Sequence, residues 1–187
     1  MKKLLFLFPL AFLAICCNHH NENKQNSDTI ISMDGMGEIK IGMKQAEVEK
    51  LLNQKFILKN ALDTADSWQD SATATYKGID LQLYFQREYT EGNNFYMYLI
   101  GLRTSSSLCK TEPGIGMGTE RSKIIAAYED GYLSLSPDFE DDSTANRSKT
   151  KSLVNIKNEY GNKQIIFYLS NKKVVAIEAA ILFHDGE

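Results

Sequence analysis

The chain has 187 residues, and its 21 Lys and Arg against 24 Asp and Glu give a formal net charge of −3. No run of basic residues follows Lys2 and Lys3, so the composition argues against a protein that binds nucleic acid. Three cysteines are present and two of them are adjacent, which excludes a disulfide-rich scaffold.

The N-terminal segment predicts export from the cytoplasm. Two lysines precede an apolar run from Leu4 to Ile15, which ends at Cys16 and Cys17. A membrane-spanning helix needs about 20 apolar residues, so this shorter run is typical of a signal peptide. The segments ending at Cys16 and at Cys17 both resemble the bacterial lipobox, whose cysteine carries a diacylglyceryl group. We therefore expect residues 1–16 to be a lipoprotein signal peptide and Cys17 to be lipidated, with Cys16 as the alternative and cleavage without lipidation as a second one.

Residues 17–30 are predicted to form a disordered tether, because the segment is polar, lacks aromatic residues and shows no periodicity. His19 and His20 lie within it, but two adjacent histidines without further ligands do not predict a metal site. A lipid anchor implies the membrane as a partner. The expected location is the bacterial cell envelope, at the outer membrane on its periplasmic or surface face.

A weak internal repeat follows the tether. Residues 37–52 and 113–128 can be laid over one another, and each copy predicts a short extended segment, a glycine turn and an amphipathic helix. Thr119 is expected to cap the second helix, and Gly131 is expected to follow its end.

Strand-like segments follow each predicted helix. Ile79, Leu81, Leu83 and Phe85 alternate with polar residues, which indicates a half-buried strand. Short turns join the strands, and short turns connect antiparallel neighbours. We therefore expect an α+β fold of two tandem units, each a short helix packed on an antiparallel β-meander. The further predicted strands are 95–103, 153–160, 164–169 and 174–183, and the two units are 31–112 and 113–187.

The first copy carries a family resemblance. Residues 39–52 resemble the motif Gly-Met-Ser/Thr-x-x-Glu-Val-x-x-x-Leu of small envelope lipoproteins of the SmpA/OmlA type, although Lys44 stands where that family usually has a capping residue. The tandem arrangement is similar to the β-lactamase-inhibitor-protein-like fold, in which two units form a concave, protein-binding sheet face. The resemblance implies fold more strongly than function.

Motifs for catalysis or cofactor binding are not found in the sequence. The turn at 114–119 lacks both the preceding strand of a dinucleotide site and the Gly-Lys-Ser/Thr of a P-loop. The acidic stretch 138–143 lacks the Gly and Glu that an EF-hand requires. Cys109 and His184 could form a thiol–imidazole pair, but a surface thiol is the simpler expectation for Cys109. We therefore expect no enzyme, no metal and no cofactor.

Four tyrosines in the predicted strands provide the remaining indication of function, a candidate protein-binding surface. Tyr84, Tyr96, Tyr98 and Tyr168 are expected on the sheet face opposite the phenylalanines, and tyrosine suits protein contact surfaces. The alternative is that packing buries both faces. The predicted function is a non-catalytic, lipid-anchored protein that binds another envelope protein through this surface. A periplasmic binder of a small apolar or glycan ligand between the repeats, lined by Trp68, is the alternative.

Overall fold

The computed structural model describes residues 27–59, 68–91, 94–140 and 146–182. The predicted signal peptide with Cys16 and Cys17, most of the predicted tether and His184 lie outside these ranges. Strands make up 54% of the described residues and helices 13%, so the protein is mostly β. No helix in the described ranges is long and apolar enough to cross a membrane.

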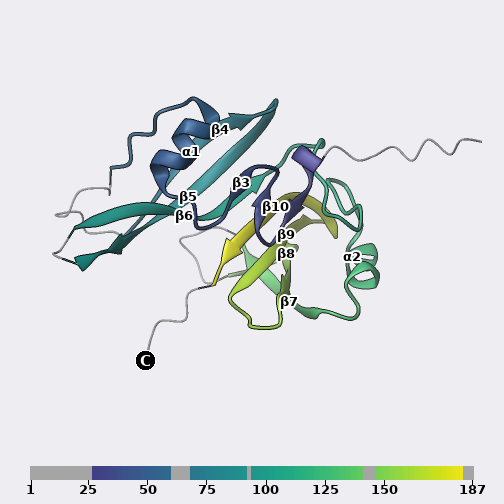
Figure 1. Cartoon of the computed structure of the whole chain (residues 1–187). Helices are drawn as coiled ribbons and strands as arrows, with labels where there is room; N and C mark the ends of the chain where they lie inside the picture. Colours follow the sequence, from purple (N-terminus) through teal and green to yellow (C-terminus); the bar gives the residue numbers. More distant parts are fainter. Residues whose placement is uncertain (1–26, 60–67, 92–93, 141–145, 183–187) are drawn as a thin grey trace, which may run out of the picture.

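Seven antiparallel strands form one sheet in the order β4-β5-β6-β10-β9-β8-β7 (Figure 1). A second sheet has three very short strands, and two short α-helices and one 3₁₀ turn complete the described elements. The strands of the large sheet are β4 Gln69–Tyr76, β5 Ile79–Tyr89, β6 Phe95–Thr104, β7 Tyr132–Phe139, β8 Arg147–Lys157, β9 Lys163–Ser170 and β10 Lys173–Ile181. The other elements are η1 Ser27–Thr29, β1 Ile31–Ser32, β2 Gly35–Met36, β3 Ile39–Lys40, α1 Gln45–Leu52 and α2 Arg121–Ala127.

The predicted α+β fold of two tandem helix-on-meander units is wrong. One sheet runs through both halves, because residues 101–104 of β6 pair with residues 177–180 of β10. The three-stranded sheet and the strands β4 and β7 were not predicted, and the helices are a minor part of the fold. One continuous hydrophobic cluster, rather than two, runs from Ile31 to Ala179. The two strands that join the halves bury apolar side chains in common, and this merges the predicted units into a single body.

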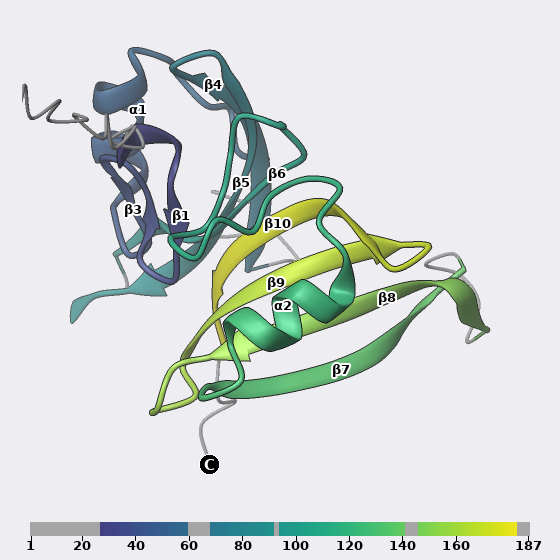
Figure 2. The same cartoon turned by 90° about the vertical axis from the view of Figure 1, so that its right-hand side faces the viewer.

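One edge of β6 is shared between two segments that lie far apart in the sequence. Leu99 accepts a hydrogen bond from Gly42 N–H (2.7 Å) and donates one to the Met43 carbonyl (2.8 Å). From Gly101 onwards β10 takes over this edge, and Ile100 is the extra residue where the register with β5 shifts. Such a bulge bends a sheet. Figures 1 and 2 show α1 and α2 on the outside of the bend between β4–β6 and β7–β10, so the helix-free face lies on its inner side.

The two helices begin close to the predicted positions, but their ends differ from the prediction. α1 starts after Lys44, whose backbone N–H donates to Glu47 Oε2 (2.7 Å), a contact typical of a helix N-terminus. α2 starts after Glu120, so Thr119 is not its cap; the Thr119 hydroxyl instead accepts a hydrogen bond from Gly116 N–H (3.2 Å). Gly131 has no left-handed conformation and does not end the helix in the predicted way.

The folded body includes the last residues of the predicted tether. Thr29 accepts a hydrogen bond from Lys110 N–H (3.2 Å), and the Lys110 carbonyl accepts one from Ile31 N–H (2.9 Å). Asp28 forms an ion pair with Lys77 Nζ (2.6 Å). Residues 27–30 are therefore held against the folded body through Lys110 and Lys77.

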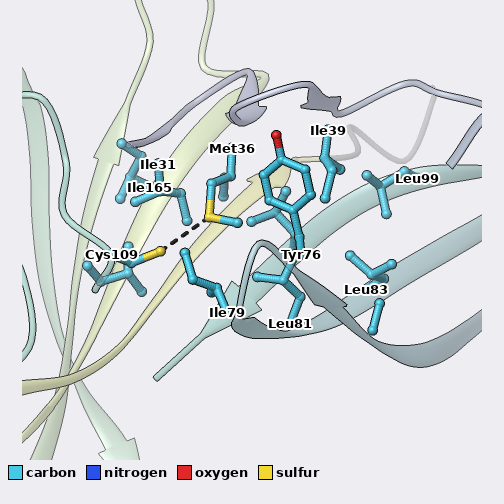
Figure 3. Packing of buried hydrophobic residues seen from close by; sticks show 14 of the residues in the cluster. Ile31, Met36, Ile39, Tyr76, Ile79, Leu81, Leu83, Leu99, Cys109 and Ile165 are labelled. Carbon is cyan, nitrogen blue, oxygen red and sulfur yellow. Dashed lines mark hydrogen bonds between the residues drawn. The ribbon is translucent and has the colours of Figure 1, made fainter. Parts of the chain in front are cut away.

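Cys109 is a core residue, and the prediction of a surface thiol is wrong. Its side chain is fully buried, and its Sγ lies 3.2 Å from Met36 Sδ. Figure 3 shows both sulfurs among Ile31, Ile79 and Ile165, where the small sheet packs against strands of both halves. Burial raises the pKa of the Cys109 thiol to about 11, so the thiol stays protonated and is a poor nucleophile at neutral pH.

Candidate functional site

All four predicted tyrosines lie on the helix-free face of the large sheet. Gln86 opposes Tyr98 and Glu88 opposes Tyr96 across β5 and β6, which places these side chains on the same face as Tyr84. Tyr168 follows on β9. The four side chains are half-buried, whereas the phenylalanines of β5 and β9 on the other face are fully buried.

Tyr84 and Tyr168 belong to a network at the junction of the two halves. Four adjacent strands contribute one side chain each: Tyr84 from β5, Arg103 from β6, Glu178 from β10 and Tyr168 from β9. The Arg103 guanidinium carbon lies 3.8 Å from the centroid of the Tyr168 ring, which is a close cation–π contact. The Tyr168 hydroxyl donates to Glu178 Oε2 at 2.8 Å. We refer to these four residues as the central network.

The backbone around the central network explains why these side chains meet. Glu178 and Arg103 are direct partners in the register of β10 and β6. Beside them, the Tyr84 ring lies next to Gly101, where a Cβ would be 3.5 Å from Tyr84 Cδ2, an ordinary van der Waals distance. The same Cβ would lie 3.2 Å from the Ala179 carbonyl oxygen, so glycine permits the close approach of β10.

The environment of the central network favours neutral tyrosines and disfavours a charged carboxylate. Burial raises the pKa of the Glu178 carboxyl, although the hydrogen bond from Tyr168 and the charge of Arg103 act in the opposite direction. Burial also raises the pKa of Tyr168 and of Tyr84, and the charge of Glu178 adds to both shifts. Arg103 opposes the shift of Tyr84 through its charge and a hydrogen bond. The network is therefore a set of hydrogen-bond donors and acceptors with one fixed positive charge.

Tyr96 and Tyr98 form a separate outer pair towards the far end of β5 and β6. Their ring centroids are 6.2 Å apart. The Tyr96 hydroxyl donates to Glu88 Oε2 at 3.1 Å, and Gln86 Nε2 donates to the Tyr98 hydroxyl at 3.5 Å. Lys44 Nζ lies 4.6 Å from the centroid of the Tyr96 ring, because the residues before α1 pair with β6. The contacts of the outer pair are longer than those of the central network.

An open groove of about 840 Å³ lies beside the central network, and Arg103 belongs to both. Its lining crosses from β4 to the start of β10 and includes Thr73, Asp80 and Gln82. Trp68, predicted as a lining residue, is not part of this groove; it is 63% exposed and makes an edge-to-face contact with a tyrosine ring at 6.5 Å. The polar lining suits a ligand with hydroxyl or amide groups better than an apolar one.

The motifs examined for metal and phosphate chemistry have structural roles where they are described. In the described ranges, no three His, Cys, Asp or Glu side chains gather so that they could hold a metal ion. Asp138 is part of β7, and residues 141–143 of the acidic stretch lie outside the described ranges. Gly114 and Gly118 have positive φ values of 85° and 78°, which only glycine adopts without strain, so the segment before α2 is a pair of tight turns.

Sequence reasoning missed Arg103 and Glu178, the two charged members of the central network. Arg103 is the only charged residue of β6 and follows Leu102, and Glu178 is the only charged residue of β10 after its first residue and follows Ile177. A lone charge in such a strand is unusual and could have marked both positions. Comparisons with family models, with curated proteins and with solved structures find no match to this chain.

Proposed function

We propose that this protein is a non-catalytic, lipid-anchored protein of the bacterial cell envelope, which binds another envelope protein through its helix-free sheet face. The observation that carries the proposal is the central network. Tyrosine and arginine are the residue types that most often dominate protein interfaces. Here Arg103 is stacked on Tyr168 and Tyr168 is hydrogen-bonded to Glu178, so a partner would meet side chains that are already ordered.

The rest of the helix-free face supports protein contact as well. Its strands present mainly uncharged side chains that can donate and accept hydrogen bonds, a composition that adapts to the polar groups of a partner. The helix-free face lies on the inner side of the bend (Figures 1 and 2), so a convex partner would fit against it. The side chains concerned are Gln69, Ser71, Thr73, Gln82, Gln86, Ser134 and Asn155.

A pull-down tests the partner. The full-length chain is captured from detergent-solubilised envelope as the wild type, as a Gln86→Arg/Tyr98→Arg variant and as a matched Ser122→Arg/Ile125→Arg variant. The first pair lies on the helix-free face, and the control pair is exposed on α2. We expect the wild type and the control to recover the same partner and the face variant to lose it. Recovery of no reproducible partner by the wild type would refute the proposal.

The anchor is tested separately by labelling cells with a palmitate analogue. The proposal rests here on the apolar run and the lipobox resemblance at Cys16 and Cys17. We expect labelling of the wild type, loss of label when both cysteines are changed to alanine, and loss in only one of the two single variants. Equal labelling of the double variant would exclude this anchor.

The groove beside Arg103 favours one alternative, a ligand with many hydroxyl groups such as a glycan. Its lining is polar, and it lies where β6 meets β10. A Gln82→Leu substitution would weaken such a ligand while leaving the outer pair unchanged. Binding of envelope glycan fragments that is insensitive to this substitution would remove the alternative.

A further inference from the structure

The large sheet has two edge strands, which differ in how far other parts of the chain cover them. The order of the sheet places β4 at one edge and β7 at the other. An edge strand presents unpaired N–H and C=O groups, and proteins usually cover such an edge or place charges on it. The two edges of this sheet can therefore be compared directly.

The β4 edge is partly covered. α1 contacts β4, and Gln54, just past the end of α1, donates from its Nε2 to the Thr73 carbonyl at 3.0 Å. The strand also carries the charged residue Asp70. A further strand cannot pair along β4 without displacing the Gln54 side chain.

The β7 edge is open over its first five residues. From Tyr132 to Ser136 the strand carries no charge, and β8 is the only described segment that hydrogen-bonds to its backbone. Tyr132 and Leu135 are 62% and 48% exposed. Pro137, which lacks an N–H, and the bulge that follows it limit pairing at the far end.

We propose that the β7 edge pairs with the β7 edge of a second copy of this chain, antiparallel and centred on Ser134. This register places Tyr132 opposite Ser136 of the second copy and Leu133 opposite its Leu135. Leu133 already packs against the core, so the exposed Leu135 gains an apolar partner in each copy. The strand is its own complement in this register, because Leu133 and Leu135 meet on both sides of Ser134 and no like charges face one another. This match is available in a second copy of the chain.

Sedimentation velocity of the full-length chain in detergent tests the pairing, over concentrations from about 1 μM to about 1 mM. We expect the wild type to form dimers reversibly as its concentration rises. Ser134→Lys places two lysines opposite one another at the centre of the pairing, and we expect it to weaken dimerisation at least about tenfold. Ser71→Lys, the same change at an exposed position of β4, and Ser134→Thr serve as controls that keep the wild-type affinity.

Hydrogen exchange on the wild type gives a second measurement that does not depend on how the variants fold. The proposal predicts that backbone amides of residues 132–136 become more protected as concentration rises, while those of β4 do not change. A wild type that stays monomeric throughout would overturn the proposal. So would a dimer that Ser134→Lys leaves intact or that Ser71→Lys weakens equally.

Discussion

The central network and the outer pair place the same residue type on the same sheet face, yet the two sites hold their tyrosines differently. Tyr168 lies under a guanidinium at 3.8 Å and donates to a carboxylate at 2.8 Å. Tyr96 has a lysine at 4.6 Å and an exposed carboxylate at 3.1 Å. Position in the sheet, rather than residue type, therefore decides how rigidly a tyrosine is held. We expect the central network to contribute to stability as well as binding, and the outer pair to contribute mainly to binding.

Removal of the Tyr168 side chain is expected to cause the largest loss of stability and to separate the two sites most clearly. Tyr168→Ala removes the ring below Arg103 and the hydrogen bond to Glu178, and we expect the free energy of unfolding to fall by about 3 kcal/mol. Tyr96→Ala removes a half-buried ring with longer contacts, and we expect a loss of about 1 kcal/mol or less. Urea denaturation of both variants measures the difference, and equal losses would show that the two sites do not differ as described.

Removal of the hydroxyl alone gives a smaller effect at the same site. Tyr168→Phe leaves the ring in place but deprives the half-buried Glu178 of its donor, which we expect to cost about 1.5 kcal/mol. The bond from Gln86 to Tyr98 is long, so Tyr98→Phe should cost about 0.5 kcal/mol or less. If Tyr98→Phe lowered the free energy of unfolding more than Tyr168→Phe in the same denaturation series, the central network would not be the more strongly bonded site.

The spacing of β6 and β10 below Tyr84 can be tested at Gly101. A methyl group there would press on the Ala179 carbonyl oxygen, which would lie 3.2 Å from the new Cβ, and we expect Gly101→Ala to cost about 1 kcal/mol. Gly131→Ala is the matched control, because its Cβ would meet nothing closer than 3.4 Å. Thermal unfolding distinguishes the two, and a neutral Gly101→Ala would show that the strands can separate without cost.

The smallest expected effect is a fall in stability with rising pH, which Glu178 of the central network supplies. Because burial raises the pKa of Glu178 above its ordinary value of 4.5, the native state binds more protons than the unfolded state just above that pH. Stability should therefore fall as pH rises from about 4.5 towards the raised pKa, by at most about 1.4 kcal/mol per pH unit. Glu178→Gln should remove this slope, measured by urea denaturation between pH 4 and pH 7.

Glu49 of α1 should show the opposite sign in the same titration. Burial works against its charge, but hydrogen bonds from Lys55, Phe56 and Gln45 outweigh that effect and lower its pKa below 4.5. Its contribution to stability is therefore present above pH 4.5 and lost as pH falls towards the lowered pKa. If Glu49→Gln and Glu178→Gln changed the pH profile in the same direction, the assignment of their environments would be wrong.

Local patterns in the sequence identified several elements of the fold but not how they join. Ile79, Leu81 and Leu83 alternate with polar residues, and the strand they indicate is present as β5. The pairing of Gly101 with Ala180 depends on contacts between residues far apart in the chain, which periodicity does not report. The edge strand β4 is rich in Ser, Thr and Ala, so its pattern did not predict a strand. The alternation of leucine and serine in β7 was a signal for a strand that the sequence analysis missed.

The sequence also predicted part of the site: it placed the tyrosines on one face but did not identify the charged residues that connect them. Tyr84 and Tyr168 were expected on one face because alternation fixes the face of a strand residue. Their link through Arg103 and Glu178 depends on the order of four strands, which only the folded sheet provides. Cys109 was expected at the surface because a lone surface thiol was the simpler explanation. Its side chain is buried although its neighbours Leu108 and Lys110 are exposed, because a loop residue can point into the core when the loop packs under another element.

Photocrosslinking in intact cells tests the proposed binding face most directly. A photoreactive phenylalanine analogue is placed at position 86 or 98 on the helix-free face and, as controls, at positions 122 and 125 on α2. The proposal predicts a discrete crosslinked species from both face positions that is absent from both helix positions. Crosslinks that arise equally from the two surfaces, or only from α2, would contradict the claim that the helix-free face is the binding surface.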